Sequence, residues 1–414
     1  MKKFLFFFTI IIILMLFYSK SITIELPKIK NNLTEFLPKE VLIFYKAISN
    51  NLVIKNYEYA YNAMYIPETQ FVDLKIVKKK LDFVTKGWFY PFYFDFYNNQ
   101  MIIVDSKGKI ILNQIERIIK DKKLDEDLIP NNINENETIM DILVVNKKLI
   151  ISYYKLDKSK NDNCFKFGIK IAEISEEFIK FDDFFNSNEC GDTIQGGRMQ
   201  YFNYKGLDGL LITVSDNKLD HPNMSAQLDT SIFGKILFFD FNSKKYTVYS
   251  KGHRNAQGLF ADKNIILSTE HGPRGGDEIN KILFGENYGW PIASYGEKYE
   301  INKNFQQYKK NHIQNNFKEP IYAFIPSIGI NEIIKIENSF SDKWQNNFLI
   351  SSLNGRSLFR LQFDNKYEKL IYSEKIFIGE RIRDLKFDKL NNVIFLALTE
   401  SSELAILINE NDYK

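Results

Sequence analysis

The sequence contains little cysteine, little histidine and almost no net charge. Its 414 residues include two Cys and four His, and the formal net charge is +3 at pH 7. So small a charge on a chain of this length argues against a nucleic-acid surface, and no nucleic-acid partner is expected. No nucleophile–base arrangement of the kind that a hydrolase needs is visible, so hydrolysis is a poor candidate for the function.

Long apolar runs are also missing, with one exception near the N-terminus. Residues Phe4–Tyr18 are apolar apart from Thr9, and they follow Lys2 and Lys3. The run is short for a membrane-spanning helix and fits the hydrophobic part of a signal sequence, although no small-x-small cleavage site follows it. We therefore expect an exported, periplasmic or otherwise extracytoplasmic protein, anchored in the membrane by residues 4–18 if the segment is retained.

The two cysteines allow a single disulfide. Cys164 and Cys190 lie 26 positions apart. Export would place them where disulfides persist, and a bridge closing a loop of this size would stabilise the fold by about 3 kcal/mol. Two independent buried thiols are the alternative. The disulfide is expected on the condition that the protein is exported.

Three regions are expected along the chain. Residues 1–21 form the signal or anchor segment, 22–70 an N-terminal extension that is partly helical, and 71–414 the main domain. From about Phe71 onward, short runs rich in Ile, Val, Phe and Tyr recur between Asn, Asp, Gly and Lys, as in Gln100–Val104. Repeated short strands without long helices are typical of a β-propeller or a sandwich. The repeat is too irregular to count blades.

Polar residues concentrate in three blocks, Gly252–Leu259, Thr269–Asn280 and Asn287–Pro291. The apolar strand Asn264–Ser268 separates the first two blocks, so both polar loops can open at the same end of one sheet. The run Gly272–Gly276 contains Pro and three Gly and predicts an irregular loop with exposed carbonyls, which calcium accepts as ligands. The alternative is a Gly-rich turn with surface charges.

Together the three blocks resemble the signature of the soluble quinoprotein glucose dehydrogenases, a family also called the glucose/sorbosone or aldose sugar dehydrogenases. The resemblance is specific within residues 252–291, looser from about Gly196 onward, and faint before Cys164. It implies an all-β, six-bladed β-propeller behind the N-terminal export or membrane helix. It also implies pyrroloquinoline quinone (PQQ) and calcium as cofactors, a sugar as substrate and an external electron acceptor.

The resemblance implies roles for six positions. Calcium would be held by the backbone carbonyls of Gly272 and Pro273, and the carboxylates and carbonyls of PQQ by Arg254, Asn255, Arg381 and Arg383. A guanidinium fork and an amide suit those groups chemically. Alternation along a strand would project Arg381 and Arg383 the same way. Without the resemblance, a solvated pair of arginines on an outer strand is about as plausible.

Two positions depart from the family pattern. The family's catalytic base is a His four residues before the Arg of a Gly-Gly-Arg strand, here Arg198; this chain has Ile194 there, with Gln195 beside it. Asn354 stands where the soluble glucose dehydrogenases have a Lys that contacts the quinone. Neither Ile nor Gln takes up a proton at neutral pH, so the residue that would act as the catalytic base is unknown. Such a base contributes roughly 10²–10⁴-fold to the rate.

The four histidines offer only weak substitutes for that base. His271 and His253 match residues common in the family at their positions, so positioning roles are expected for them first. His221 and His312 lie in loops without a partner pattern and are expected at the surface.

Two functions stay open. The leading one is a PQQ- and calcium-dependent sugar (aldose) dehydrogenase that oxidises a sugar hydroxyl outside the cytoplasm. The alternative is a non-catalytic propeller of the same family that binds a ligand or a partner, which the residues at Ile194 and Asn354 favour. The retained calcium loop and arginine pair favour the dehydrogenase.

Overall fold

The computed structural model describes residues 69, 72–85, 87, 90–120, 124–159, 164–216, 224–298 and 308–410. The predicted export segment, nearly all of the N-terminal extension and His221 lie outside the described residues. None of the helices within these ranges combines the length and the apolar character needed to cross a membrane.

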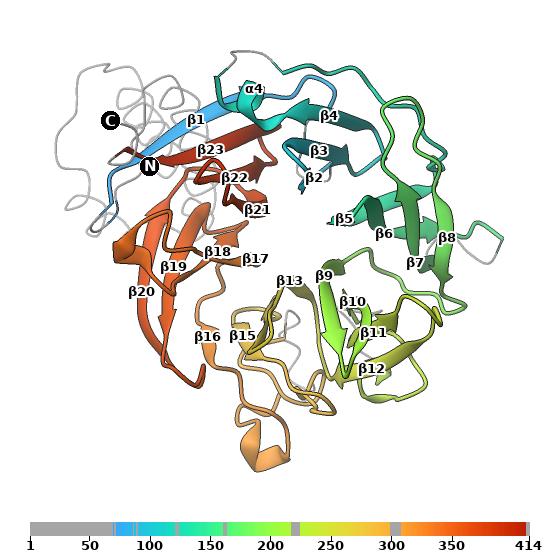
Figure 1. Ribbon diagram of the computed structural model, residues 1–414. Coiled ribbons are helices and arrows are strands. Elements are labelled where there is room, and N and C mark those ends of the chain that lie inside the picture. The colour runs from blue at the N-terminus through green and yellow to red at the C-terminus, as the bar shows by residue number, and fades with distance from the viewer. Residues whose placement is uncertain are drawn as a thin grey trace, which may run out of the picture. The chain divides into compact units, whose positions relative to one another are not determined.

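Six antiparallel sheets surround a common centre (Figure 1). The strands of each sheet follow in order from the innermost to the outermost. The first three sheets are β2 (Phe92–Tyr97), β3 (Gln100–Asp105), β4 (Ile110–Gln114); β5 (Glu137–Val145), β6 (Lys148–Leu156), β7 (Phe165–Glu173), β8 (Asp182–Asn186); and β9 (Gly196–Tyr204), β10 (Leu207–Val214), β11 (Lys235–Asp240), β12 (Tyr246–Lys251). The other three are β13 (Ala256–Ala261), β14 (Ile266–Glu270), β15 (Asp277–Lys281), β16 (Tyr322–Phe324); β17 (Ile330–Lys335), β18 (Phe348–Ser352), β19 (Ser357–Phe363), β20 (Leu370–Phe377); and β21 (Ile382–Asp388), β22 (Val393–Leu398), β23 (Glu403–Asn409), β1 (Leu74–Lys80).

The innermost strands β2, β5, β9, β13, β17 and β21 contact one another in that order, and β21 contacts β2. This closed ring is a six-bladed β-propeller, which confirms the predicted fold. Helical structure in the described ranges is limited to α4 (Ile115–Lys120) and the 3₁₀ turns Ser225–Gln227, Ile313–Asn315 and Asp342–Trp344.

Local sequence explains the hairpins that build each blade. Strands rich in β-branched and aromatic residues suit a pleated, buried surface. Asparagine stands at the turns between β2 and β3, β5 and β6, and β21 and β22, where Asn98, Asn146 and Asn392 have φ of 53°, 57° and 56°. Asparagine tolerates this left-handed region better than most residues, so each turn reverses the chain with little strain.

A separate apolar cluster fills each of the six interfaces between neighbouring blades. Between the sheets of β5–β8 and β9–β12, for example, Phe167, Leu210 and Phe239 are fully buried. Burial of one such side chain contributes about 1.5–3 kcal/mol. Blade-to-blade packing is therefore the main apolar stabilisation, and the centre of the ring is left for polar residues.

The first and last described strands close the ring. All seven residues of β1, Leu74–Lys80, pair antiparallel with Asn409 back to Glu403 of β23. The last blade is thus assembled from both ends of the described chain.

The predicted disulfide between Cys164 and Cys190 is confirmed, with the two Cα atoms 4.9 Å apart. Beside it, Phe165 and Gly191 exchange two backbone hydrogen bonds of 2.9 Å. The bridge therefore fastens the segment after β8 to the beginning of β7.

Candidate functional site

The two polar loops around β14 do open at the same end of one sheet. Arg254 and Asn255 directly precede β13, and His271 directly follows β14. Because β13 and β14 are antiparallel neighbours, the start of one lies beside the end of the other. The backbone N–H of His271 donates to the carbonyl of Asn255 over 2.9 Å. The antiparallel pairing alone therefore brings the predicted blocks together.

One carboxylate shapes the glycine-rich loop. Asp277 accepts hydrogen bonds from the backbone N–H groups of Gly272 (3.1 Å), Ile328 (3.0 Å) and Ile330 (2.9 Å). A Cβ on Gly272 would collide with the carbonyl oxygens of Gly275 and Gly276. Several backbone oxygens are thus crowded against one residue, and only glycine fits there.

Arg254 clamps this loop from the side. Its Nη1 donates to the carbonyls of His271 (3.1 Å) and Gly272 (2.9 Å), and its guanidinium lies 5.3 Å from the ring centre of Trp290. One of the two carbonyls predicted to hold calcium therefore faces a guanidinium in this structure. A guanidinium and a cation compete for the same oxygen, so calcium at Gly272 requires Arg254 to turn away.

A chain of amides leads from Asn255 to Arg383. Asn255 Oδ1 accepts from Ser215 Oγ (2.8 Å) and Gln257 Nε2 (2.7 Å), and Asn255 Nδ2 donates to Gln195 Oε1. Gln257 Oε1 accepts from Arg383 Nη1 over 3.0 Å. Below, the cradle means Arg254, Asn255, Gln257, His271 and Arg383. The structure thus joins Asn255 and Arg383, which are far apart in the sequence.

Arg383 of β21 carries a buried positive charge whose nearest charged neighbours include two further arginines. Arg381 stands one residue before the strand and Arg383 inside it. The pKa of Arg383 is lowered to about 10, mainly by burial and then by the charges of Arg198 and Arg381, against the opposing effect of Tyr93 and Asp384. The buried Nε of Arg383 has no hydrogen-bond partner among the described residues. An anionic ligand would relieve both conditions.

The two candidate histidines differ sharply. Both ring nitrogens of His253 are engaged, Nε2 with Ser250 Oγ (2.8 Å) and Nδ1 with Glu270 Oε2 (3.0 Å). The Nε2 of His271, by contrast, is buried without a hydrogen-bond partner in the described ranges. Burial, followed by the charges of Arg254 and Arg383, lowers the pKa of His271 to about 4, against the pull of Asp277. His271 is therefore neutral near pH 7 and is a weak base.

The two positions that depart from the family pattern, Ile194 and Asn354, have different environments. Ile194 packs against the apolar cluster between the sheets of β5–β8 and β9–β12. Its neighbour Gln195 instead faces the cradle through Asn255. Asn354 is exposed in the loop after β18, where its backbone N–H donates to the carbonyl of Ile328 over 3.1 Å. The predicted base position is thus occupied by a partly buried apolar side chain at the edge of the hydrophobic core.

Sequence reasoning missed a pair of buried acids beside the cradle. Glu270 and Glu278 stand directly opposite each other on β14 and β15. Burial and then the charge of Glu270 raise the pKa of Glu278 well above its usual range. The two acids line one small cavity with Arg254, His271 and Gly272. The available signal was one acid, Glu270, at the end of a strand whose other residues are apolar or small.

The expectation that His312 lies at the surface is wrong. Its side chain is 1% exposed, and its Nε2 is 4.0 Å from Glu278 Oε1. The aromatic ring of Tyr295 lies against it, at 5.2 Å between ring centres. A tertiary contact between loops buries this residue, and no local pattern announces such a contact.

Side-chain clusters for a metal are missing from the described residues: no group of three or more His, Cys, Asp and Glu is arranged to hold one. Any calcium site there would have to draw on backbone carbonyls, such as those crowded around Gly272. The donor set fits an anionic cofactor better, because the orphaned nitrogens of Arg383 and His271 lie in the cradle.

Comparison with known proteins agrees with this geometry. Residues 90–407 match the family model described as glucose/sorbosone dehydrogenase. An aldose sugar dehydrogenase of Escherichia coli is 29% identical over 153 residues, an alignment that covers 36% of this chain and 40% of that relative. The chain thus covers less than half the length of this curated relative.

Two solved structures share the fold. The soluble aldose sugar dehydrogenase of Escherichia coli in its apo form has a TM-score of 0.64 at 20% identity and covers 81% of this chain and 99% of its own. The PQQ-bound form of an aldose sugar dehydrogenase from Streptomyces coelicolor has a TM-score of 0.56 at 17% identity, covering 81% and 98%.

Proposed function

Because the chain belongs to the glucose/sorbosone dehydrogenase family, we propose that it oxidises a sugar hydroxyl outside the cytoplasm with PQQ and calcium as cofactors. The observation that carries this proposal is the cradle, in which the cationic Arg383 and the neutral His271 both have a buried nitrogen without a partner in the described part of the chain. A compact ligand with several carboxylates and ring carbonyls, as PQQ is, suits that set. The PQQ-bound relative supports the choice.

Residues of the cradle and of the segments beside it have distinct roles in this proposal. Arg383 and Arg381 bind carboxylates, and Asn255, held by Ser215 and Gln257, offers its amide to a ring carbonyl. The carbonyls of Gly272 and Pro273 hold calcium once Arg254 turns toward the ligand. PQQ, when bound, supplies the acceptor for the hydride removed from the sugar carbon.

The proton of the sugar hydroxyl needs an acceptor that this chain does not provide at the expected place. Ile194 cannot take it, and both nitrogens of His253 are engaged. His271 is the better placed of the two histidines, but a pKa near 4 makes it a weak base near neutral pH. We therefore expect slow turnover in the wild-type protein.

The disulfide supports export. Bridged cysteines persist in oxidising compartments, and Cys164 and Cys190 are bridged. In this proposal the sugar and an external electron acceptor meet the protein outside the cytoplasm, and the only membrane contact is the segment of residues 4–18.

A second candidate function is a propeller that binds a ligand without turning it over. The packing of Ile194 against the apolar cluster favours it, because an apolar contact has replaced an ionisable side chain at the base position. In that case the cradle holds an anion and no sugar is oxidised.

Calorimetric titration of metal-stripped protein with PQQ, with and without calcium, tests the cofactor. We expect tight calcium-dependent binding that Arg383→Ala weakens by roughly 30- to 150-fold, the value of a charged hydrogen-bonded contact of about 2–3 kcal/mol. Arg117→Ala on the exposed side of α4 is the matched control and should leave the affinity unchanged. Undetectable binding to the wild type would overturn the quinoprotein assignment.

A dye-linked sugar oxidation assay on the PQQ-loaded protein then separates the two candidates. Turnover by the wild type would rule out the pure binding module. Ile194→His restores an imidazole at the base position, and if the base limits the reaction the rate should rise by roughly 10²–10⁴-fold. Ile194→Val keeps the apolar packing and serves as its control. Equal rates for both variants would show that the missing base is not what limits turnover.

A further inference from the structure

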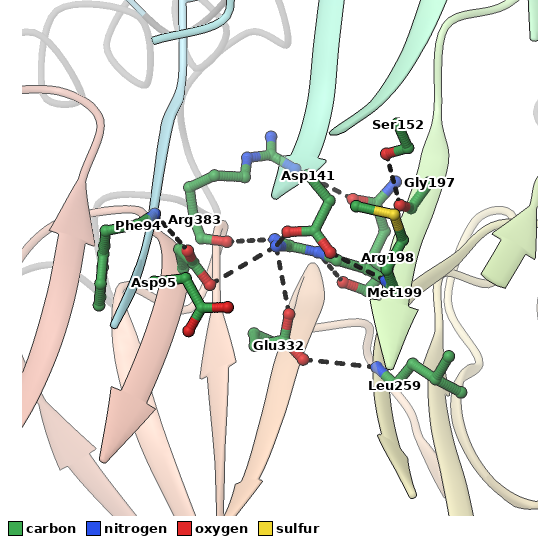
Figure 2. A network of polar contacts seen from close by, with 12 residues as sticks. Phe94, Asp95, Asp141, Ser152, Gly197, Arg198, Met199, Leu259, Glu332 and Arg383 are labelled. Carbon is green, nitrogen blue, oxygen red and sulfur yellow. Dashed lines mark hydrogen bonds and ion pairs between the residues drawn. The ribbon is translucent and has the colours of Figure 1, made fainter. Parts of the chain in front are cut away.

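A single arginine at the centre of the propeller touches every blade. Arg198 lies on the innermost strand β9 and is 2% exposed. Its guanidinium has partners on the five other innermost strands. Three are acids, Asp141 of β5 (3.0 Å), Glu332 of β17 (3.2 Å) and Asp384 of β21 (3.5 Å), and Figure 2 shows Arg198 beside Asp141, Glu332 and Arg383. The others are the backbone carbonyls of Gln257 of β13 (2.8 Å) and Arg383 of β21, and the ring of Tyr93 of β2 (5.2 Å to its centre).

The three carboxylates around Arg198 fasten neighbouring blades to each other. Asp141 accepts from the backbone N–H of Met199 (2.8 Å), Asp384 from that of Phe94 (3.0 Å) and Glu332 from that of Leu259 (3.4 Å). Arg198, Asp141, Glu332 and Asp384 are called the axial cluster below. Every nitrogen and oxygen of these four side chains has a partner, so the cluster is a completed network.

This cluster is joined directly to the cradle. Arg198 Nε donates to the backbone carbonyl of Gln257, and Arg198 Nη2 donates to that of Arg383. The side chains of the same two residues bond each other, Arg383 Nη1 to Gln257 Oε1, over 3.0 Å. One guanidinium therefore links two backbone positions whose side chains belong to the cradle; the carbonyl of Arg383 also accepts from Asn331 Nδ2.

The contact with β21 also has an electrostatic side. The charge of Arg198 is one of the influences that lower the pKa of Arg383, after burial and against Tyr93. Three carboxylates surround Arg198 itself, whereas Arg383 is left with a buried nitrogen that has no described partner. Arg198 thus holds Arg383 in place while keeping it receptive to an anion.

We propose that Arg198 is a positioning residue of the anion site: through the two backbone carbonyls it sets the distance between Gln257 and Arg383 and so the geometry of the cradle. The proposal rests on the proposed function only for the identity of the anion. Lysine cannot replace arginine in this role, because one ammonium does not offer the fixed fork that reaches two carbonyls and several carboxylates together.

The test separates charge from geometry with Arg198→Met and Arg198→Lys. The Met variant removes the charge and the fork, whereas the Lys variant restores the charge alone. We expect urea stability to recover largely from Met to Lys, while PQQ affinity in calorimetry stays about 10- to 100-fold below the wild type in both, as for other residues that orient a ligand-binding group. Recovery of stability and affinity together in Arg198→Lys would overturn the proposal.

Arg360→Lys is the matched control. Arg360 is 4% exposed, pairs with Glu374 (2.6 Å), and lies against the rings of Trp344 and Tyr372, but it belongs to β19 away from the centre. It should lose stability comparable to that of Arg198→Lys and keep the wild-type affinity for PQQ. A similar loss of affinity in both would mean that the effect is general destabilisation and would overturn the proposal.

A second readout needs no ligand. Hydrogen–deuterium exchange of the unliganded variants should show faster exchange in peptides covering residues 255–258 and 381–385 for Arg198→Lys, and no change there for Arg360→Lys. Unchanged exchange in Arg198→Lys would overturn the positioning role. If the wild type fails to bind PQQ, the proposed function falls, and this exchange experiment still decides the role of Arg198. If Arg198→Met does not fold, the Lys variant carries the comparison with the wild type.

Discussion

The axial cluster and the cradle are neighbouring polar regions that differ in how completely their side-chain atoms are hydrogen-bonded or ion-paired. In the axial cluster, one cation meets three carboxylates and every side-chain polar atom has a partner. In the cradle, the buried Nε of Arg383 and Nε2 of His271 have none among the described residues. Both regions are built from the same inner strands, and Arg198 bonds to backbone carbonyls that belong to cradle residues.

The difference separates structure from function. Buried polar groups in folded proteins are nearly always paired, so a network in which every group has a partner needs no ligand to account for it. A buried donor without a partner costs about 1–3 kcal/mol and persists where a ligand supplies what is missing. Buried atoms without a described partner also occur elsewhere, as at Trp344 and Ser402, so what distinguishes the cradle is that two such nitrogens lie beside an arginine and a set of amides.

The largest effect should come from breaking the satisfied region. Arg198→Met leaves Asp141, Glu332 and Asp384 buried without the cation that they share. We expect a loss of about 3–5 kcal/mol in the free energy of unfolding, measured by urea denaturation. A loss below about 1 kcal/mol would contradict the view that this cluster holds the six blades together.

The equivalent change in the cradle should act on binding instead. Arg383→Met removes a partly exposed cation whose guanidinium, within the described part of the chain, donates one side-chain hydrogen bond, to Gln257. We expect PQQ affinity to fall by roughly 30- to 150-fold, or about 2–3 kcal/mol. The free energy of unfolding without ligand should stay within about 1 kcal/mol of the wild type or rise. Marked destabilisation without loss of affinity would reverse the comparison.

Acidic pH should favour the folded state through the axial cluster. Burial, and then Asp384 and Asp141 against Arg198, raises the pKa of Glu332 to about 7, and burial raises that of Asp141 to about 6. Unfolded carboxyl groups titrate near pH 4. The folded state therefore holds protons between about pH 4 and 7 that the unfolded chain has lost, and stability falls as pH rises through this window.

The contribution of Glu332 to this slope should be on the order of 2 kcal/mol between pH 4.5 and 7. Glu332→Gln, which keeps an oxygen for the N–H of Leu259, should remove that part of the slope in urea titrations at several pH values. Asp141, Asp384, Lys386 and Arg198 face Glu332 from the other inner strands, and burial of Glu278 gives a residual slope of the same sign. An unchanged slope would show that Glu332 stays ionised.

The smallest expected effect is the difference in stability between variants of the two histidines, His253 and His271. His253→Gln disturbs two hydrogen bonds and leaves the buried Glu270 with a weaker partner, so it should cost about 1–2 kcal/mol in thermal or urea unfolding. His271→Gln alters a ring whose Nε2 has no described partner, and stability should change by no more than about 0.5 kcal/mol. Equal losses would erase the distinction between the satisfied and the unsatisfied site.

Much of the fold could be predicted because the signals are local. Leu149–Tyr153 lies within β6 and Val393–Leu396 within β22, where apolar and aromatic residues suit buried strands. The closure of the ring could not be predicted in the same way. The strand β1 contains four lysines in seven residues, and its partner β23 lies at the other end of the described chain. No local pattern encodes such a pairing.

The same limit applies to the site. Arg254, Asn255 and Gly272 come together through one antiparallel pair of strands, and their neighbourhood could be read from the sequence. The axial cluster could not, because Asp141 and Glu332 are acids within largely apolar strands of different blades. Their meaning depends on a shared centre that exists only once six sheets have closed around it.

The pairing of β1 with β23 determines when the last blade can form during synthesis of the chain. Leu74 and Asn409 are register partners about 335 positions apart. At a synthesis rate of roughly 5–20 residues per second, β1 waits between about 15 and 70 s for its partner. Throughout that interval β1 has no partner strand, and its unpaired backbone groups are a place where misassembly can begin. Ring closure, and with it the meeting of β21 and β2 around Arg198, is therefore a late event in the life of each molecule.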